Sequence, residues 1–258
     1  MEELPGRRRF LKSVIAMGAV GLPAAEASGQ AHVHGPTHVA QAAETPPLAR
    51  ESRAYMYLTA PEIAFVDAAV GRLIPADEQG PGAKEAGVTY FIDQQLFGGW
   101  GTMAKMYRQG PHPEGTPQQG YQSPLTPQEV YRAAIREING VIGKPFEKLT
   151  AGEQDDLLRR LEDGKLALES VPGRFFFNML LDNTIEGFFS DPIYGGNRDK
   201  LGWKLVGFHG VAAVYTTHVD KHGVPYHAEP VSILDMLEGR AEADEHGHPK
   251  HVLLSRKD

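Results

Sequence analysis

The order of apolar and polar residues along the 258-residue chain repeats one helical signature three times. A threonine at position 59, 126 or 150 is followed, three residues later, by a glutamate. In such a capping box the two side chains satisfy free amide groups at the start of a helix. Behind each box, apolar residues recur at intervals of three and four, which is the spacing of one helix face. The three stripes are Ile63, Val66, Val70, Leu73 and Ile74; Val130, Ala134, Ile138 and Val141; and Leu157, Leu158 and Leu161.

Two further helices are expected over residues 83–97 and 172–188. Their apolar positions are Ala86, Tyr90, Phe91 and Leu96 in the first, and Phe176, Phe177, Leu180, Leu181 and Ile185 in the second. No segment alternates apolar and polar residues over more than a few positions, and no rhythm of strands and helices is visible. The pattern therefore predicts an all-α fold: a single helical domain with long irregular loops.

Two segments without helical periodicity, residues 98–125 and 188–208, are longer than a structural connection needs. The second is rich in aromatic residues and glycine, which indicates an irregular platform rather than a helix. Its central turn is predicted at Asp191-Pro192, because proline fixes its own φ and restricts the residue before it. Gly195 and Gly196 allow the backbone to fold sharply just afterwards. Glu186 and Asp191 are the polar residues expected to hold this loop in place.

The aromatic side chains of residues 188–208 have two possible roles. They could cover the helical core of their own chain, or they could anchor a partner protein, because Tyr, Trp, Phe and Arg concentrate in interface cores. The two roles can apply to different side chains. The residues predicted to form a partner interface are Phe188, Phe189, Tyr194, Asn197 and Trp203.

The first 27 residues read as an export signal rather than as part of the fold. The twin-arginine pattern R-R-x-F-L-K is matched by Arg7, Arg8, Phe10, Leu11 and Lys12. A weakly apolar run of about nine residues follows, too short for a bilayer span of roughly 20 residues. Cleavage is expected after Ala27, or as late as Ala31. We therefore expect export to the periplasm by the twin-arginine pathway.

The rest of the chain divides into three parts. Residues 28–58 contain Gly, Pro, Ala and His without periodicity, which predicts a linker or an extended arm. The helical domain is expected over residues 59–215, and residues 216–258 form a C-terminal extension.

Composition removes several classes of function. The chain has no cysteine, which excludes disulfides, thiolate metal sites, Cys-ligated iron–sulfur clusters, covalently attached c-type haem and a Cys nucleophile. Its net charge of −7 argues against nucleic acid as a partner, since phosphate binding needs a basic face. The sequence contains neither a G-x-G-x-x-G fingerprint nor a G-x-S-x-G elbow. No cofactor-binding or catalytic residue is therefore assigned in this chain.

The histidines suggest an alternative function. They form three groups: His32, His34 and His38; His218, His222 and His227; and His246, His248 and His251. The middle group could serve an autonomous, exported metal-binding protein, because residues four apart share a helix face. None of the groups comes with a carboxylate at a recognised ligand spacing such as H-E-x-x-H. Solvated or partner-facing histidines are the preferred interpretation, and no metal ligand is assigned.

Several short motifs follow one another in a fixed order between residues 60 and 215. They are Leu73-Ile74-Pro75-Ala76-Asp77, Pro81-Gly82-Ala83, Phe91-Ile92-Asp93, Phe146 with Leu149 and Gln154, the stretch T-I-E-G-F-F-S-D-P-I-Y-G-G-N at 184–197, Gly202-Trp203, and Gly207-Phe208. Together with the twin-arginine leader, this order resembles the gluconate 2-dehydrogenase subunit 3 family, the small subunit of membrane-bound gluconate 2-dehydrogenase. His209-Gly210 departs from the Pro-Gly expected there.

The resemblance implies a non-catalytic partner in an oxidoreductase complex. In such complexes a large FAD-containing subunit oxidises a sugar, sugar acid or polyol, and a multihaem cytochrome c subunit passes electrons to quinone. The small subunit resembles an escort that supplies the export signal and stabilises the flavin subunit. FAD and haem c are then expected in partner subunits only, and membrane association only through those partners.

Overall fold

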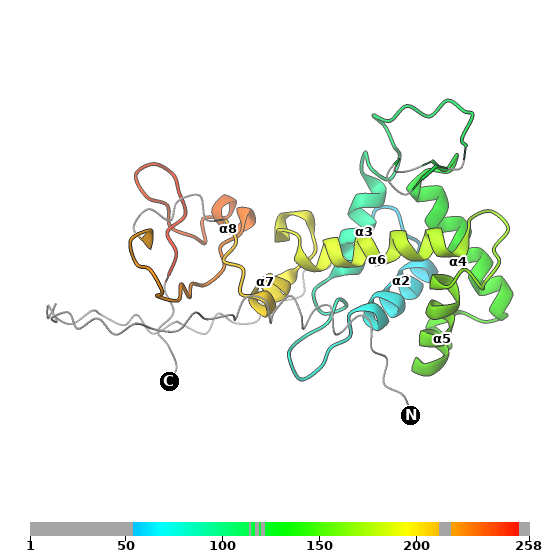
Figure 1. Ribbon diagram of the computed structural model, residues 1–258, viewed down its shortest axis with the longest axis horizontal. Coiled ribbons are helices and arrows are strands. Elements are labelled where there is room, and N and C mark those ends of the chain that lie inside the picture. Colours follow the sequence, from blue (N-terminus) through cyan, green and yellow to red (C-terminus); the bar gives the residue numbers. More distant parts are fainter. Residues whose placement is uncertain (1–53, 114, 117–118, 120–121, 212–217, 253–258) are drawn as a thin grey trace, which may run out of the picture. The chain divides into compact units, whose positions relative to one another are not determined.

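The computed structural model describes residues 54–113, 115–116, 119, 122–211 and 218–252. The predicted export signal, both cleavage positions and residues 28–53 of the predicted arm lie outside the described residues. Within the described part, α-helices and short 3₁₀ turns are the only regular elements, apart from isolated β-bridges (Figure 1). The predicted all-α class is confirmed for this part of the chain.

Five helices make up the body of the domain, and shorter elements follow them. The longer helices are α2 (Ala60–Leu73), α3 (Val88–Phe97), α4 (Pro127–Ile142), α5 (Ala151–Glu162) and α6 (Gly173–Phe189). The short elements are η2 (Phe146–Lys148), η3 (Pro192–Tyr194), η4 (Arg198–Lys200), α7 (Leu201–Val206) and α8 (Ile233–Leu237).

The predicted capping boxes set where three of these helices begin. The Thr126 amide donates to a carboxylate oxygen of Glu129 at 2.7 Å, and the Glu129 amide donates to the Thr126 hydroxyl at 3.2 Å. The same reciprocal bonds start α5, and the Thr59 amide donates to Glu62 at 2.8 Å at the start of α2. These bonds satisfy amides that have no partner inside the helix. The helix starts predicted at Thr59, Thr126 and Thr150 are confirmed.

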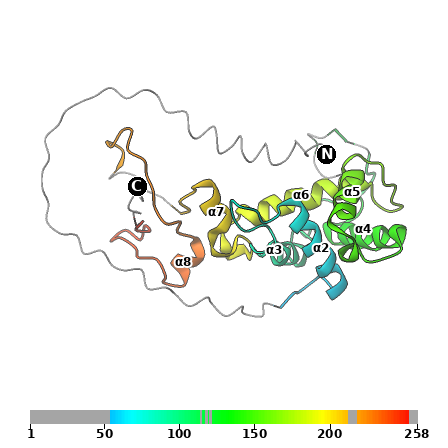
Figure 2. The same ribbon diagram turned by 90° about the horizontal axis from the view of Figure 1, so that it is seen from below.

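Helix α6 is the centre of the fold, because it contacts α2, α3, α4, α5 and α7 (Figures 1 and 2). An aromatic cluster fills the space beneath it: Phe65 lies 4.7 Å from Phe146 and 6.3 Å from Phe176, ring centre to ring centre. Tyr131 meets Phe176 edge-on at 5.4 Å, and its hydroxyl donates to Asn183 at 2.8 Å. Burial raises the pKa of Tyr131 well above its ordinary value, so this phenol stays neutral.

The helix predicted over residues 83–97 begins later, at Val88. The preceding residues form a turn, since the Ala83 amide donates to the Ile74 carbonyl at 2.8 Å. Gly87 then has a left-handed φ of 76°, which stops any helix from continuing through it. The stretch before Val88 closes the end of α2, a tertiary contact that helical periodicity does not report.

Residues 201–206 form the short helix α7, so the prediction of a helix-free loop over 188–208 was wrong for this part. The helix starts after Lys200, whose φ of 57° is left-handed. Its close approach to α6 depends on Gly202, where a Cβ atom would lie 2.0 Å from the Phe188 carbonyl oxygen. Glycine is therefore present here for packing, although it reads as a helix breaker in the sequence.

Two residues of the predicted apolar stripes face solvent. Val141 is 58% exposed near the end of α4, and Ile185 is 41% exposed on α6. Most of the other predicted positions of these two stripes are buried as expected, among them Val130, Ala134, Ile138, Phe176, Phe177 and Leu180. The buried faces are wider than predicted, because Tyr131 and Ile135 on α4 and Asn183 and Thr184 on α6 are buried as well.

A buried carboxylate fixes the segment that precedes the first helix of the body. Asp93 on α3 accepts hydrogen bonds from the amides of Met56, Tyr57 and Leu58 at 2.7, 2.9 and 2.8 Å. The last residues of the predicted 28–58 arm are thus joined to α3. Among the described residues no helix is both long and apolar enough to cross a bilayer.

Candidate partner-binding site

The loop that follows α6 folds back on the end of the helix. Phe188 is fully buried, and Trp203 on α7 is 6% exposed. The indole N–H of Trp203 donates to the Phe189 carbonyl at 2.7 Å, which satisfies its polar atom inside the fold. Phe188 and Phe189 meet edge-on at 5.1 Å. The aromatic residues of the loop therefore complete a core of their own chain to a large extent.

Asn197 is the central polar residue of this loop. Its side chain is completely buried, donates to the Ser190 carbonyl at 2.8 Å and accepts from the Gly202 amide at 2.8 Å. It thereby joins the end of α6 to the beginning of α7. Its φ of 45° is left-handed, a conformation that asparagine tolerates better than most residues.

Asp191 connects the loop to the C-terminal extension. One carboxylate oxygen accepts from the Ile193 amide at 3.0 Å, which starts the turn at Pro192. The other accepts from the Ile233 amide at 2.7 Å, at the beginning of α8. Asp191 therefore has the loop-holding contacts expected from the sequence, and one of them reaches across to residues beyond 216.

Gly195 and Gly196 let the loop lie directly on the helices. Gly195 has a left-handed φ of 94°, and a Cβ atom there would lie 2.7 Å from the Tyr90 ring. A Cβ atom on Gly196 would lie 2.2 Å from the Gly187 carbonyl oxygen. Both positions lack space for any side chain, so the pair is needed for close approach as well as for turning.

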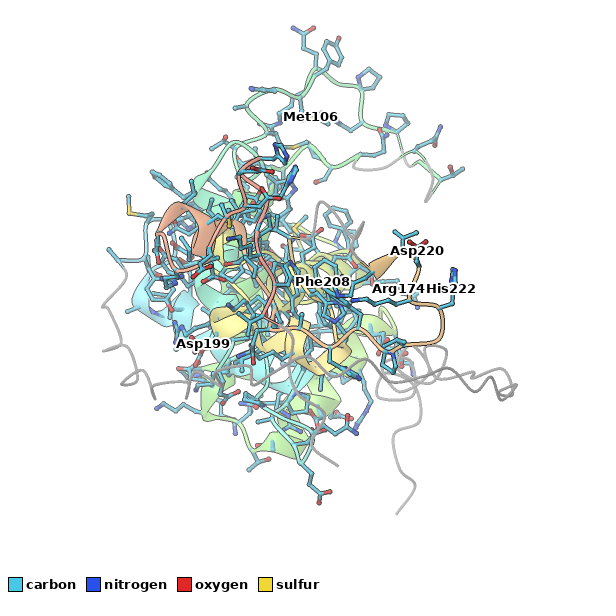
Figure 3. All side chains as sticks on the ribbon, turned by 90° about the vertical axis from the view of Figure 1, so that its left-hand side faces the viewer. Met106, Arg174, Asp199, Phe208, Asp220 and His222 are labelled. Carbon is cyan, nitrogen blue, oxygen red and sulfur yellow. The ribbon has the colours of Figure 1, made fainter. Side chains whose placement is uncertain are left out.

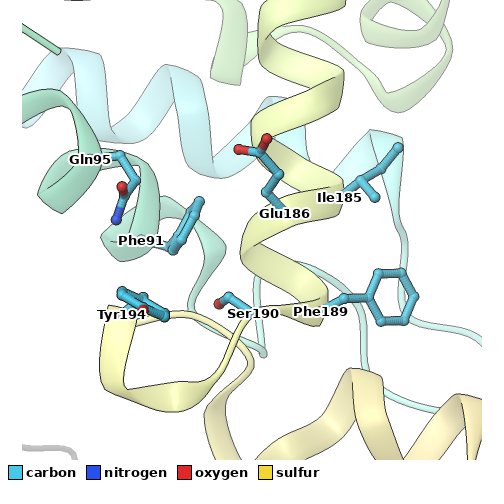
Figure 4. Close-up of a pocket in the computed structure, with 7 residues that line it drawn as sticks. All are labelled: Phe91, Gln95, Ile185, Glu186, Phe189, Ser190 and Tyr194. Atoms are coloured by element: carbon cyan, nitrogen blue, oxygen red, sulfur yellow. The ribbon is translucent and has the colours of Figure 1, made fainter. Parts of the chain in front are cut away.

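Glu186 was expected to hold the loop, and the hydrogen bond that the structure gives it lies within its own helix. Its carboxylate accepts from the Asn183 side chain at 3.3 Å, one turn back on the same helix. Its side chain projects from α6 toward α3 in Figure 4, away from the backbone of residues 190–203. The loop is held by Asp191 and Asn197 instead, because these side chains lie within it.

An open groove of about 410 Å³ lies between α3, α6 and η3 (Figure 4). Tyr194 is 55% exposed at its edge, Ile185 is 41% exposed, and Phe189 is partly buried. The groove is lined by Phe91, Gln95, Ile185, Glu186, Phe189, Ser190 and Tyr194. Of the five residues predicted for a partner interface, Phe189 and Tyr194 face this groove, whereas Phe188, Asn197 and Trp203 are buried within their own chain.

Ile185 is the groove residue that sequence reasoning missed, since it was expected in the core. The sequence does contain a signal for this position, namely the two polar residues that precede it, Asn183 and Thr184. Asn183 bonds Tyr131, and the Thr184 hydroxyl donates to the Leu180 carbonyl at 2.6 Å. Both polar side chains point inward, which leaves position 185 outside the buried face of the helix.

Asp235 fastens the C-terminal extension to the loop. Its carboxylate accepts from Lys200 at 2.7 Å and from Arg240 at 3.0 Å, and also from the Ser232 amide and hydroxyl. The Ser232 contacts form a fourth capping box, at the start of α8. Burial opposes the charged form, yet hydrogen bonds from Lys200, Ser232 and Arg240 hold the pKa of Asp235 far below its ordinary value.

The histidines that the structure describes do not form a recognisable metal centre. Residues 32, 34 and 38 lie outside the described residues, and His222 projects from an outlying segment beside Asp220 (Figure 3). His209 and His218 each lie 4.9 Å from the Tyr226 ring, and the His251 ring lies 6.1 Å from it. In the described part of the chain, no group of three or more His, Cys, Asp or Glu side chains is arranged to hold a metal ion. The alternative metal-binding function gains no support from this geometry.

The other long loop, after α3, exposes its large side chains. Trp100 is 41% exposed, Met106 is 60% exposed and Tyr107 is 83% exposed. Met106 stands away from the helices in Figure 3. A bond from Arg108 to the Pro124 carbonyl at 2.6 Å connects the two sides of the loop.

The comparison with known protein families covers the segment that contains the groove and both of its walls. The family described as gluconate 2-dehydrogenase subunit 3 matches residues 60–210, more than half of the chain. No curated protein and no solved structure matches the sequence. With its helical body, its folded-back loop and its groove all inside the matched residues, the chain belongs to the gluconate 2-dehydrogenase subunit 3 family.

Proposed function

We propose that this chain is a non-catalytic accessory subunit of a periplasmic, membrane-associated, FAD-dependent dehydrogenase complex of the gluconate 2-dehydrogenase type. Membership of the family supports the coarser part of this proposal, a subunit of a gluconate 2-dehydrogenase complex. Its specific task is to supply the twin-arginine export signal and to stabilise the flavin subunit. FAD, haem c and the substrate site belong to the partner subunits.

The groove between α3 and α6 is the observation that carries this proposal. Its exposed Ile185 and Tyr194 line one groove together with Phe91 and Phe189, so most of the groove surface is apolar. An exposed apolar surface with polar residues around it is typical of a protein–protein contact. Asp191 and Asn197 bond the backbone of the loop that carries Tyr194, and so hold this side of the groove in place.

The predicted leader supports the second part of the proposal, which is export. A twin-arginine signal is suited to a protein that is folded, or bound to a partner, before export. One such signal could therefore export the flavin subunit together with this chain. Residues 1–53 lie outside the described residues, and this element depends on the sequence pattern alone.

Co-expression of the full chain with its flavin subunit tests the proposal. Replacing Arg7 and Arg8 together by Lys should remove dehydrogenase activity from the periplasm and leave both chains in the cytoplasm. The matched control is Arg9→Lys, which alters the variable position of the same motif and should leave export unchanged. Normal export of the double variant would refute the signal. Oxidation of gluconate by the purified chain alone would refute the accessory role.

A further inference from the structure

The amphipathic pattern of α6 is reversed beside the groove. Asn183 is 4% exposed and Thr184 is fully buried, whereas Ile185 is 41% exposed. A helix that served only the core of its own chain would place isoleucine inside and polar residues outside. Here the two buried polar groups are satisfied by Tyr131 and by the Leu180 carbonyl, so the arrangement is stable and the isoleucine remains on the surface.

The walls of the groove are rigid. Gly187 lies against Phe91, where a Cβ atom would come within 2.7 Å of the ring. Tyr194 is carried by η3, which is fixed by the bond from the Ile193 amide to Asp191. A groove built from packed helices and a bonded turn loses little conformational entropy when a partner enters it.

Glu186 lines this groove and Asp182 precedes it by one turn on α6, and among the described residues neither carboxylate is paired with a cation. Asp182 and Glu186 are one turn apart on the exposed side of α6, so their like charges repel each other. None of the ion pairs between described residues includes either of them. Partial burial alone raises the pKa of Asp182, with no cation to offset it. Elsewhere in the same fold, Asp155, Asp67 and Asp235 each pair with Arg or Lys at 2.7 Å.

We propose that the groove receives a segment of the flavin subunit which seats an apolar side chain against Phe91, Ile185 and Tyr194 and places an arginine or lysine between Asp182 and Glu186. The inference rests on the proposed function and adds the chemistry by which the partner is recognised. Arginine fits this position best, since its planar donors can bond two carboxylates at once.

Charge favours the flavin subunit over a second copy of this chain as the occupant. The chain has a net charge of −7, so two copies repel each other on average. The carboxylates of Glu186 in the groove and of Asp182 one turn before it favour a partner whose contacting segment is basic. The basic side chain relieves the repulsion between Asp182 and Glu186, and the apolar side chain covers the exposed isoleucine.

The test measures the affinity of the full chain for its co-expressed flavin subunit at about 50 and about 300 mM NaCl, between which the Debye length falls from about 14 to about 6 Å. The double variant Asp182→Asn with Glu186→Gln should bind roughly tenfold more weakly at low salt and lose most of the salt dependence. Ile185→Ser should weaken binding by a similar factor and keep the salt dependence.

Matched controls come from exposed positions away from the groove. Asp156→Asn on α5 removes an exposed carboxylate, and Val141→Ser on α4 removes an exposed apolar side chain. Both should bind as the unaltered chain does. Thermal unfolding of each variant alone should stay close to that of the unaltered chain, because none of the altered side chains is part of the buried core.

The outcomes separate the inference from the proposed function. If the unaltered chain does not associate with the flavin subunit, the proposed function fails, and the inference with it. If it associates and the groove variants bind with unchanged affinity and salt dependence, only the inference is refuted. If the groove variants instead abolish self-association of the chain, measured by its sedimentation, the occupant is a second copy and the inference is likewise refuted.

Discussion

Two glycine-rich loops of this protein contain similar residues and place them in opposite ways. Residues 190–203 put Trp203 and Asn197 inside the fold and bond the loop to α6, α7 and α8. Residues 98–113 leave Trp100 and Tyr107 exposed. The difference lies in short polar side chains. Asp191 and Asn197 bond the backbone of the first loop, and the second has no buried polar side chain among its described residues.

Composition therefore does not say whether an aromatic loop faces inward or outward. An inward aromatic residue needs a partner for its polar atom and space for its backbone to approach, and the first loop supplies both through the Phe189 carbonyl and its glycines. The comparison yields experiments that alter equivalent residues in both loops.

Replacing a glycine by alanine should give the largest difference in stability between variants of the two loops. Gly196→Ala places a Cβ atom 2.2 Å from the Gly187 carbonyl oxygen, so the loop must move away from α6. We expect a loss of roughly 3 kcal/mol in the free energy of unfolding. Gly99→Ala in the other loop meets no atom within 4 Å and should change stability by less than about 0.5 kcal/mol. Urea unfolding of both variants measures the difference, and equal stabilities would show that residues 190–203 are not packed on α6.

The buried amide should give the next largest effect. Asn197→Ala leaves the Ser190 carbonyl and the Gly202 amide without their partner, at a cost of roughly 2–3 kcal/mol. In the exposed loop, Tyr107→Ala removes a hydroxyl that reaches only the Gln109 side chain, and it should be nearly neutral. Differential scanning calorimetry of the two variants tests the contrast. A loss of stability in Tyr107→Ala as large as that in Asn197→Ala would contradict it.

The smallest of the three effects depends on pH. The folded-state pKa of Asp235 lies below its ordinary value of 3.8, so its ion pairs stabilise the fold above about pH 5. This stabilisation is lost as the pH falls through 4 and lower. In that range Asp235 binds a proton in the unfolded chain, where its pKa is ordinary, but not yet in the folded chain, and this favours unfolding. Asp235→Asn should cost about 1–2 kcal/mol at pH 7 and progressively less in acid.

The corresponding ion pair of the exposed loop provides the control for this pH dependence. Arg108 and Glu129 lie 3.8 Å apart with exposed side chains, so Arg108→Gln should cost less than about 0.5 kcal/mol at any pH. Unfolding midpoints at pH 7, 5 and 3 measure both variants. A difference between Asp235→Asn and the unaltered chain that stays constant down to pH 3 would show that Asp235 contributes through packing rather than through charge.

Local patterns in the sequence predicted the helices well, but they predicted poorly which other segments each helix contacts. The capping boxes at Thr59, Thr126 and Thr150 are complete within four residues, so no tertiary information was needed. The start of α3 depends instead on a bond between Ala83 and Ile74, across a turn. The helix α7 depends on Gly202 lying against Phe188. Contacts of this kind are set by the assembled fold, which periodicity does not encode.

The candidate site shows the same division. Tyr194 was expected at an interface and is exposed, and Asp191 was expected to hold its loop and has the contacts to do so. Trp203 was also expected at an interface, but it is buried. Its burial is possible because the Phe189 carbonyl accepts a hydrogen bond from the indole N–H. Ile185 was assigned to the core from its apolar side chain alone, although its two polar neighbours take the inward positions.

The three amides bound to Asp93 also define where a mechanical pull on the N-terminal segment would reach the domain. Met56, Tyr57 and Leu58 share one carboxylate, so tension arriving from residue 54 is divided among charge-assisted bonds before it reaches α2. Such a pull would then be passed to α3 through these bonds as well as along the backbone to α2. Asp93 would thus be the residue through which a pull on the chain before α2 first loads α3.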